Sequence, residues 1–249
     1  MTTIATDPTV DPEEVRKFAS LAAEWWNPRG KFAPLHKFNP ARLRFVREAA
    51  ARHFARDQKA LKPFGGLSLL DIGCGGGLLS EPMARMGFAV DGADASSENI
   101  QIASAHAAQS GVGVTYRFTT AEALAAAGES FDVVLNMEVI EHVTDPELYL
   151  RSCAQLVKPG GLMFVGTLNK TLKSLVLGKV AAEYVLGWVP AGSHDWSRFI
   201  PPKVLVGMLK DVGLNVTSTT GVVFDPLTWS WSLSSDVDIN YLVAAEKPR

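Results

Sequence analysis

The chain has 249 residues, of which 47% are hydrophobic and 20% charged, and its net charge at pH 7 is −2. This balance is that of an ordinary globular protein and excludes a disordered or fibrous chain. The chain also lacks the excess of positive charge with which proteins bind nucleic acids, so no nucleic-acid partner is expected. Its two cysteines, Cys74 and Cys153, are too few for a disulfide framework.

The first residues, 1–12, are polar and contain no lysine or arginine. They lack the basic start and the apolar stretch of a secretory signal, so we expect a frayed tail. The most apolar stretch, residues 175–189, is interrupted by Lys179 and Glu183 and is too short to span a bilayer. We therefore expect a reduced, cytoplasmic protein.

Two helices are predicted before the first strand, within residues 13–62. In residues 13–26 the apolar side chains recur every three or four positions, as on one face of an amphipathic helix. Asn39 is a candidate N-cap with Pro40 at the first helical position, which predicts a second helix running to about residue 54.

Strands and helices then alternate through residues 67–167. Short apolar runs predict strands at 67–72, 88–93, 114–118, 131–136 and 162–167. Helical patterns lie between them at 78–86, 97–109, 122–127 and 146–157, with a turn at 158–161. Pro82 fits the first of these helices only if that helix starts late. This order predicts a parallel sheet with right-handed crossovers and helices on both faces.

The C-terminal third departs from this alternation. Residues 170–200 form a largely apolar insertion, followed by a predicted helix at 202–212 and strands at 215–220 and 237–245. A long connection, residues 221–235, separates these last two strands, which would let them pair in antiparallel. We expect a single α/β domain with a seven-stranded, mostly parallel sheet.

A glycine-rich loop follows the first predicted strand and contains Gly73, Gly75, Gly76 and Gly77. In an open α/β sheet this turn lies at the carboxyl edge, where ligands bind. A dinucleotide fingerprint would place glycine or alanine at position 78, where this chain has Leu78. That residue disfavours a nicotinamide oxidoreductase.

Two acidic residues flank the loop and narrow the choice of ligand. Asp94 ends the second predicted strand, where a carboxylate accepts hydrogen bonds from the hydroxyls of a ribose. Asp71 precedes the glycines and puts negative charge beside the loop, which suits a cationic ligand and repels a pyrophosphate. S-adenosylmethionine, which carries a sulfonium and an ammonium group, fits both residues. A non-catalytic adenosyl-binding module would have the same loop.

The loop segment resembles the first motif of class I S-adenosylmethionine methyltransferases, whose fold is Rossmann-like. A closer resemblance, to the ubiquinone biosynthesis O-methyltransferases, extends through residues 23–26, 34–43, 137–143, 167–169 and 236–241. It implies methyl transfer to phenolic hydroxyls of polyprenylated catechol and phenol intermediates. Another small phenolic or lipid substrate is the alternative.

The resemblance also assigns residues to the cofactor site. It places Arg42, Gly73, Asp94 and Met137 there, beside Asp71 and Gly75 of the loop. The Arg42 guanidinium suits the methionine carboxylate of the cofactor, and Met137 suits an apolar wall beside adenine. Cys74 lies within the loop and is expected to be a small packing residue.

An acidic cluster with a histidine follows the fourth predicted strand. Glu138, Glu141 and His142 would share one face of a helical turn, and two carboxylates with an imidazole could bind a divalent cation. The resemblance implies the same three metal ligands. We expect Mg²⁺ as the ion and Glu141 and His142 as catalytic residues. His142 acting as a general base without a metal, or a purely structural cluster, are the alternatives.

The insertion suggests how a prenylated substrate reaches the site. Residues 170–196 contain too many apolar side chains for an ordinary surface loop. They resemble the membrane-contacting insertion of the same family, which implies peripheral association with the inner membrane and contact with a ubiquinone-biosynthesis complex. The alternative is a helix packed in the core or a dimer contact.

Overall fold

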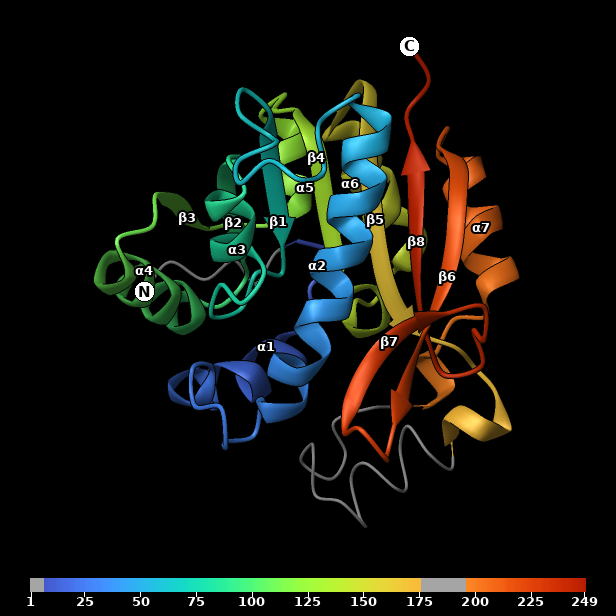
Figure 1. The fold of residues 1–249 in the computed structure, drawn as a ribbon, viewed down its shortest axis with the longest axis horizontal. Coiled ribbons are helices and arrows are strands. Elements are labelled where there is room, and N and C mark those ends of the chain that lie inside the picture. Colours follow the sequence, from blue (N-terminus) through green and yellow to red (C-terminus); the bar gives the residue numbers. More distant parts are fainter. Residues whose placement is uncertain (1–6, 176–195) are drawn as a thin grey trace.

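The computed structural model describes residues 7–175 and 196–249, and an eight-stranded sheet forms its centre (Figure 1). The strand order is β3-β2-β1-β4-β5-β8-β6-β7. The strands are β1 (Ser68–Ile72), β2 (Ala89–Asp94), β3 (Val114–Phe118), β4 (Phe131–Met137), β5 (Val157–Leu168), β6 (Asn215–Asp225), β7 (Ser230–Ser234) and β8 (Asn240–Glu246). The strands from β3 to β5 are parallel, and β8, β6 and β7 extend the sheet in antiparallel.

Helices cover both faces of the sheet because successive strand residues point to opposite sides. Leu70 and Val134 belong to the core under α5 (Ala121–Ala126), α6 (Pro146–Gln155) and α7 (Pro202–Asp211). Their neighbours Leu69 and Val133 belong to a second core, under α2 (Ala33–His53) and α3 (Ser80–Arg85). The parallel sheet, the antiparallel pairing of the two late strands and the helices on both faces are thus as predicted.

The expected number of seven strands is wrong for the described residues, because residues 221–235 are not a plain connection. They complete β6 and form β7, joined by a tight turn in which the Asp225 carboxylate accepts hydrogen bonds from the Leu227 amide and the Thr228 hydroxyl, both at 2.8 Å. Serines alternate with Trp231 and Leu233 in β7, and these two apolar side chains pack against the core under α2. Because every second residue is a serine, the sequence of this segment looks like a polar connection, although it forms a half-buried strand.

The N-terminal helices also differ from the prediction. One helix was expected over residues 13–26, but the structure has α1 (Pro12–Ala19) and a short 3-10 turn, η1 (Ala22–Glu24). The second helix, α2, begins at Ala33, so Asn39 lies inside it and Pro40 is an interior proline. Asn39 is not an N-cap, because its amide donates instead to the Leu78 carbonyl at 2.7 Å, beyond the glycine loop.

The segment of residues 7–11 is not a frayed tail. The Thr9 side chain is buried and donates to the Glu122 carboxylate, and the Thr144 hydroxyl donates to the Pro8 carbonyl at 2.6 Å. In the first crossover, α3 begins at Ser80, which places Pro82 in the first turn, where a missing amide proton costs no helical hydrogen bond. The remaining crossover helix is α4 (Ser97–Ser110).

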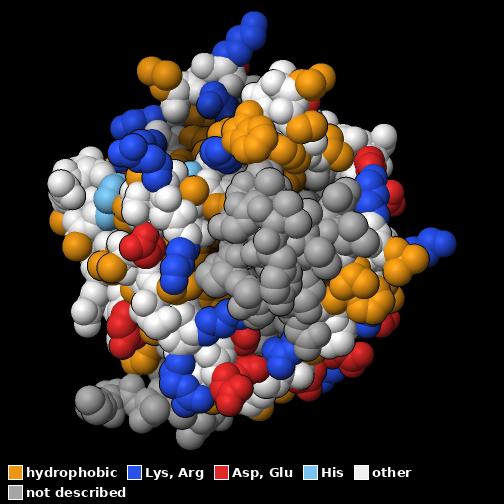
Figure 2. Space-filling view, turned by 90° about the horizontal axis from the view of Figure 1, so that it is seen from below, with side chains coloured by type: hydrophobic (Ala, Val, Ile, Leu, Met, Phe, Trp, Pro, Cys, Tyr) orange, Lys and Arg blue, Asp and Glu red, His pale blue; other side chains and the backbone are white. Residues whose placement is uncertain are grey.

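In Figure 1 the arrows of β1 and β5 point downward, and Figure 2 shows the molecule from below. Hydrophobic side chains gather there at two margins of the surface, with lysine and arginine side chains nearby. Most of the predicted apolar insertion, residues 176–195, lies outside the described residues. Among the residues that the structure describes, no helix has the length and apolar character needed to cross a membrane.

Candidate active site

A pocket opens at the carboxyl ends of β1, β2 and β4, against the glycine loop. Gly73 and Gly75 both have left-handed backbones, with φ of +66° and +54°. A side chain on Gly73 would collide with Val139, and one on Gly75 with the ring of Trp25. Glycine is therefore required at both positions by backbone conformation and by close packing.

Trp25 forms a wall of this pocket that we did not predict from the sequence. Its ring stacks on Phe32 with centroids 3.8 Å apart, and its indole nitrogen donates to Asn99 Oδ1 at 2.9 Å. Trp25 and Asn99 both line the pocket. The sequence predicts Trp25 only as one apolar position of a helix. No local signal indicates that its ring packs on the glycine loop, 50 residues later in the chain.

Asp94 is held in a fixed orientation at the end of β2. Its carboxylate accepts from the Gly75 amide at 2.9 Å, the Ser96 amide at 2.8 Å and the Asn99 side chain at 3.2 Å. Burial raises the pKa of Asp94, and the two backbone amides oppose that rise by stabilising the ionised form. A carboxylate fixed at this edge of the sheet is suited to accept hydrogen bonds from ribose hydroxyls.

Asp71 lies deeper in the same pocket and is almost fully buried. Burial raises its pKa to about 6, although the Ser80 hydroxyl donates to it at 2.6 Å. The carboxylate is therefore mostly ionised at pH 7, as attraction of a cationic ligand requires. Burial also raises the pKa of the neighbouring Cys74 thiol well above its usual range, which keeps this cysteine protonated and unreactive.

Arg42 reaches the pocket from α2 and is 3% exposed. Its guanidinium forms an ion pair with Glu138, donates to Asn39 Oδ1 at 3.1 Å and lies 5.2 Å from the centre of the Phe38 ring. Its Nε is buried without a hydrogen-bond partner among the described residues. This is the position expected for a group that binds a carboxylate.

Met137 ends β4 and completes an apolar part of the wall. It is 5% exposed, it lines the pocket, and its sulfur packs closely over Gly166. Thr120 and Glu122, at the start of α5, line the same pocket. The six residues predicted to bind the cofactor, Arg42, Asp71, Gly73, Gly75, Asp94 and Met137, thus come together around one cavity.

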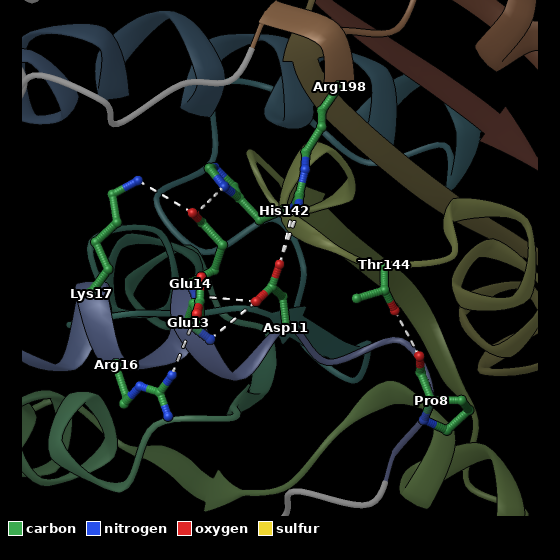
Figure 3. Close-up of polar contacts among 9 residues, drawn as sticks. All are labelled: Pro8, Asp11, Glu13, Glu14, Arg16, Lys17, His142, Thr144 and Arg198. Carbon is green, nitrogen blue, oxygen red and sulfur yellow. Dashed lines mark hydrogen bonds and ion pairs between the residues drawn. The ribbon is translucent and has the colours of Figure 1, made fainter.

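His142 lies on the other side of the pocket, on the 3-10 turn η2 (Ile140–His142) that follows β4. Its Nδ1 is 2.8 Å from the Glu14 carboxylate of α1 (Figure 3). Phe18 packs edge-on against its ring. The hydrogen bond with His142 lowers the pKa of Glu14 to about 2. Glu14 is therefore ionised and favours the histidine tautomer that carries its proton on Nδ1.

The three predicted metal ligands do not converge. Glu138 has a left-handed backbone and pairs with Arg42, while Glu141 is 3% exposed and accepts from the Thr167 hydroxyl at 2.9 Å. They share no helical face, because the turn begins only after Glu138. Within residues 7–175 and 196–249, no three His, Cys, Asp or Glu side chains group as a metal site. The expected magnesium site does not fit this arrangement.

Glu141 is also separated from the substrate side of the pocket. It is not among the residues that line the cavity, and one of its carboxylate oxygens is buried without a partner among the described residues. Burial raises its pKa. Glu141 is predicted from the sequence to be catalytic, and in this structure it is buried, with the Thr167 hydroxyl as its hydrogen-bond donor.

Comparison with known protein families gives one matching model, that of a methyltransferase domain, over residues 36–219. Among curated proteins, the ubiquinone biosynthesis O-methyltransferase of Parvibaculum lavamentivorans is 58% identical over 97% of this chain and 95% of its own length. The protein of the same name from Cereibacter sphaeroides is 57% identical over 97% of this chain and 98% of its own length.

Solved structures give the same fold at lower identity. A methyltransferase from Thermotoga maritima, described as a possible histamine N-methyltransferase, matches with a TM-score of 0.66 at 19% identity over 94% of this chain and 99% of its own. Magnesium protoporphyrin IX methyltransferase from Synechocystis with bound S-adenosylmethionine matches with a TM-score of 0.61 at 17% identity, over 97% and 100% of the two chains. The fold is therefore that of class I S-adenosylmethionine-dependent methyltransferases.

Proposed function

This chain belongs to the family of ubiquinone biosynthesis O-methyltransferases, and on that premise we propose that it methylates phenolic hydroxyls of polyprenylated catechol and phenol precursors. S-adenosylmethionine is the methyl donor. The observation that carries the proposal is that one cavity is lined both by the loop residues Gly75 and Asp94 and by the pair of Glu14 and His142. A cofactor held by the first set faces a base held by the second.

The reaction is a direct displacement. The substrate oxygen attacks the methyl carbon of the sulfonium as the carbon–sulfur bond breaks, leaving S-adenosylhomocysteine and a methyl ether. A phenol has a pKa of about 10, so the phenolate is scarce at neutral pH and a base must accept the proton. We assign this role to His142 Nε2, because Glu14 accepts the hydrogen bond of a protonated Nδ1.

The remaining residues have roles in binding. Asp94 accepts hydrogen bonds from the ribose, the Arg42 guanidinium pairs with the methionine carboxylate, and Met137 packs beside adenine. Asp71 supplies the negative charge that favours a cationic donor over a dinucleotide. No step is assigned to a metal ion, because Glu138, Glu141 and His142 have separate partners.

The mechanism is tested with labelled S-adenosylmethionine and a short-chain demethylated ubiquinol. We expect His142→Gln to lower kcat by about 100-fold or more while S-adenosylhomocysteine still binds, since a positioned base contributes about this factor. The assay is run with EDTA and again with added Mg²⁺. If EDTA abolishes the activity of the unmodified protein and Mg²⁺ restores it, the assignment to His142 is contradicted and a metal ion assists proton removal.

We further propose that the face in Figure 2 docks on a lipid bilayer, where a prenylated substrate is dissolved. At the tip of the β6–β7 hairpin, Leu227 is 94% exposed and Trp229 is 49% exposed, with the Lys37 ammonium 5.3 Å from the Trp229 ring. Leu172, at the start of the insertion, is 76% exposed. An exposed tryptophan beside a lysine is typical of membrane-interface anchors.

Vesicle flotation tests this docking surface. We expect Leu227→Asp combined with Trp229→Asp to reduce the fraction of protein that floats with liposomes of mixed anionic and zwitterionic lipids. Leu61→Asp is the matched control, because Leu61 is 91% exposed and lies outside the hairpin and the insertion. Equal flotation of the hairpin variant and the control would contradict the role of the hairpin, and deletion of residues 170–196 tests the insertion in the same assay.

A further inference from the structure

Two carboxylates compete for one buried cation in the cofactor pocket. The Arg42 guanidinium is 3% exposed, so it needs a counter-charge within the protein. In this structure Glu138 supplies that charge. The family assignment requires the same guanidinium to receive the α-carboxylate of S-adenosylmethionine, and the following inference rests on that proposed function.

The surroundings of Arg42 fix it in place. Asn39 accepts from one of its terminal nitrogens at 3.1 Å and is itself bound to the Leu78 carbonyl at 2.7 Å. The ring of Phe38 covers another side of the group. The guanidinium is therefore held in place if Glu138 moves, and a carboxylate that binds to it must do so at its present position.

Glu138 is the movable member of the pair. Its side chain is 23% exposed, compared with 3% for Arg42, and it lines the pocket. Its φ of +56° is an uncommon conformation for a residue with a side chain, and it directly follows the last residue of β4. The ion pair with Arg42 compensates for this backbone strain, so loss of the pair would favour movement of Glu138.

We infer that Glu138 is a placeholder for the cofactor carboxylate, which displaces it from Arg42 and releases it into the pocket. If both carboxylates stayed on one guanidinium, they would share a single cation in a pocket that already holds the carboxylates of Asp71 and Asp94. Binding of the cofactor and pairing of Glu138 with Arg42 are thus mutually exclusive. Glu138 is a positioning residue that couples cofactor binding to the rearrangement of the site.

The test compares two ligands without net charge that differ in the amino-acid part, which includes both the α-carboxylate and the α-ammonium. S-adenosylhomocysteine carries the amino-acid part, and 5′-methylthioadenosine lacks it. By titration calorimetry we expect Glu138→Gln to bind S-adenosylhomocysteine about tenfold more tightly than the unmodified protein, a usual size for coupling between sites. Its affinity for 5′-methylthioadenosine should stay the same, because that ligand does not compete for Arg42.

Glu122→Gln is the matched control, since Glu122 lines the same pocket and is not a partner of Arg42. A gain of equal size for both ligands, no gain for S-adenosylhomocysteine, or the same gain in the control would overturn the inference. Failure of the unmodified protein to bind S-adenosylhomocysteine would instead overturn the proposed function.

A second measurement needs no variant and covers the case in which Glu138→Gln does not fold. Hydrogen exchange is followed for a peptide spanning residues 137–143 of the unmodified protein. We expect S-adenosylhomocysteine to change the exchange of the Glu138 amide, which donates to the Gly166 carbonyl at 2.9 Å, whereas 5′-methylthioadenosine leaves it unchanged. Identical exchange with both ligands would contradict displacement of Glu138.

Discussion

The pocket has two walls that are built in different ways. One, here called the sheet wall, consists of residues 71–77 and Asp94 and lies at the ends of paired strands. The other, here called the strap, consists of residues 7–19 and includes α1, which has no buried residue. Side-chain contacts hold the strap: Asp11 with Arg198, Glu14 with His142, and Pro8 with Thr144 (Figure 3).

The two walls have different roles in the proposed reaction, because one holds the cofactor and the other contacts the base. In the proposed function the sheet wall holds the cofactor, and its residues lie directly at the ends of β1 and β2, whose positions are fixed by the sheet. The strap contributes Glu14, which contacts the proposed base, and the polar contacts that help to hold α1 can open at lower cost. Changes in the sheet wall should therefore affect folding and cofactor binding together, whereas changes in the strap should affect turnover.

The largest effect is expected in the sheet wall. Gly75→Ala should lower kcat/KM by about 100-fold or more and weaken binding of S-adenosylhomocysteine, because the new methyl group displaces Trp25 and misplaces the cofactor. Gly128→Ala is the control, since Gly128 also has a left-handed backbone, with φ of +73°, but open space around it. If both variants lose binding equally, backbone strain and not the Trp25 contact is responsible.

The next effect is on stability as a function of pH. The pKa of Asp71 is about 6 in the folded protein, above its value of 3.8 when unfolded, so this group stabilises the fold below pH 4 and that stabilisation is lost as the pH rises through 6. Asp71→Asn should remove this dependence, raising the free energy of unfolding at pH 7 by about 3 kcal/mol while weakening cofactor binding. Urea unfolding at pH 4 to 8 provides the measurement, and an unchanged slope would refute the role of Asp71.

An effect on turnover is expected in the strap. Glu14→Gln should lower kcat by about tenfold to 100-fold with little change in the affinity for S-adenosylhomocysteine, because His142 loses its orienting carboxylate. Glu13→Gln is the control, as Glu13 is 87% exposed and pairs only loosely with Arg16. A loss of cofactor affinity that matches the loss of kcat would show that the strap serves binding and would break the distinction between the walls.

The same carboxylate predicts how acid affects the strap. The pKa of Glu14 falls from 4.5 to about 2 on folding, so its stabilising contribution is present above pH 4.5 and is lost as the pH falls through 2. The contribution of Asp71 to stability changes with pH in the opposite direction. We expect the amides of α1 to lose protection relative to those of β1 as the pH falls from 5 to 2, after correction for intrinsic exchange. Parallel changes in α1 and β1 would indicate that the strap and the sheet open together.

The smallest effect is expected at the outer end of the strap. Arg198 donates two hydrogen bonds to Asp11, at 3.1 and 3.2 Å, and is 41% exposed. Arg198→Gln should speed amide exchange in α1 by no more than about fivefold, since exposed ion pairs contribute about 1 kcal/mol or less. Arg16→Gln, whose pair with Glu13 is at 4.0 Å, should leave exchange unchanged.

The central sheet and the positions of the glycine loop, Asp71 and Asp94 at its edge could be predicted because their signals are local. Leu69 and Leu70 belong to a short apolar run bounded by glycines, which predicts a strand, and Asp94 ends the next such run. The alternation of strands and helices therefore places Asp71 and Asp94 at the same edge of the sheet. Asn39 was misassigned for the opposite reason. A cap residue and an interior residue look alike in sequence when the contact that decides between them, here with Leu78, is 39 residues away.

The amino-acid sequence by itself determined the alternation of strands and helices and the glycine loop, because these depend on spacing over a few residues. It also indicated the family, through short motifs in separate segments of the chain. Only the tertiary structure decided that Glu14 meets His142 across 128 residues and that Glu138 meets Arg42 across 96. Spacing along the chain cannot fix such pairs, since they depend on how separate helices dock on the sheet. For the same reason, the three expected metal ligands, which are neighbours in sequence, have different partners in space.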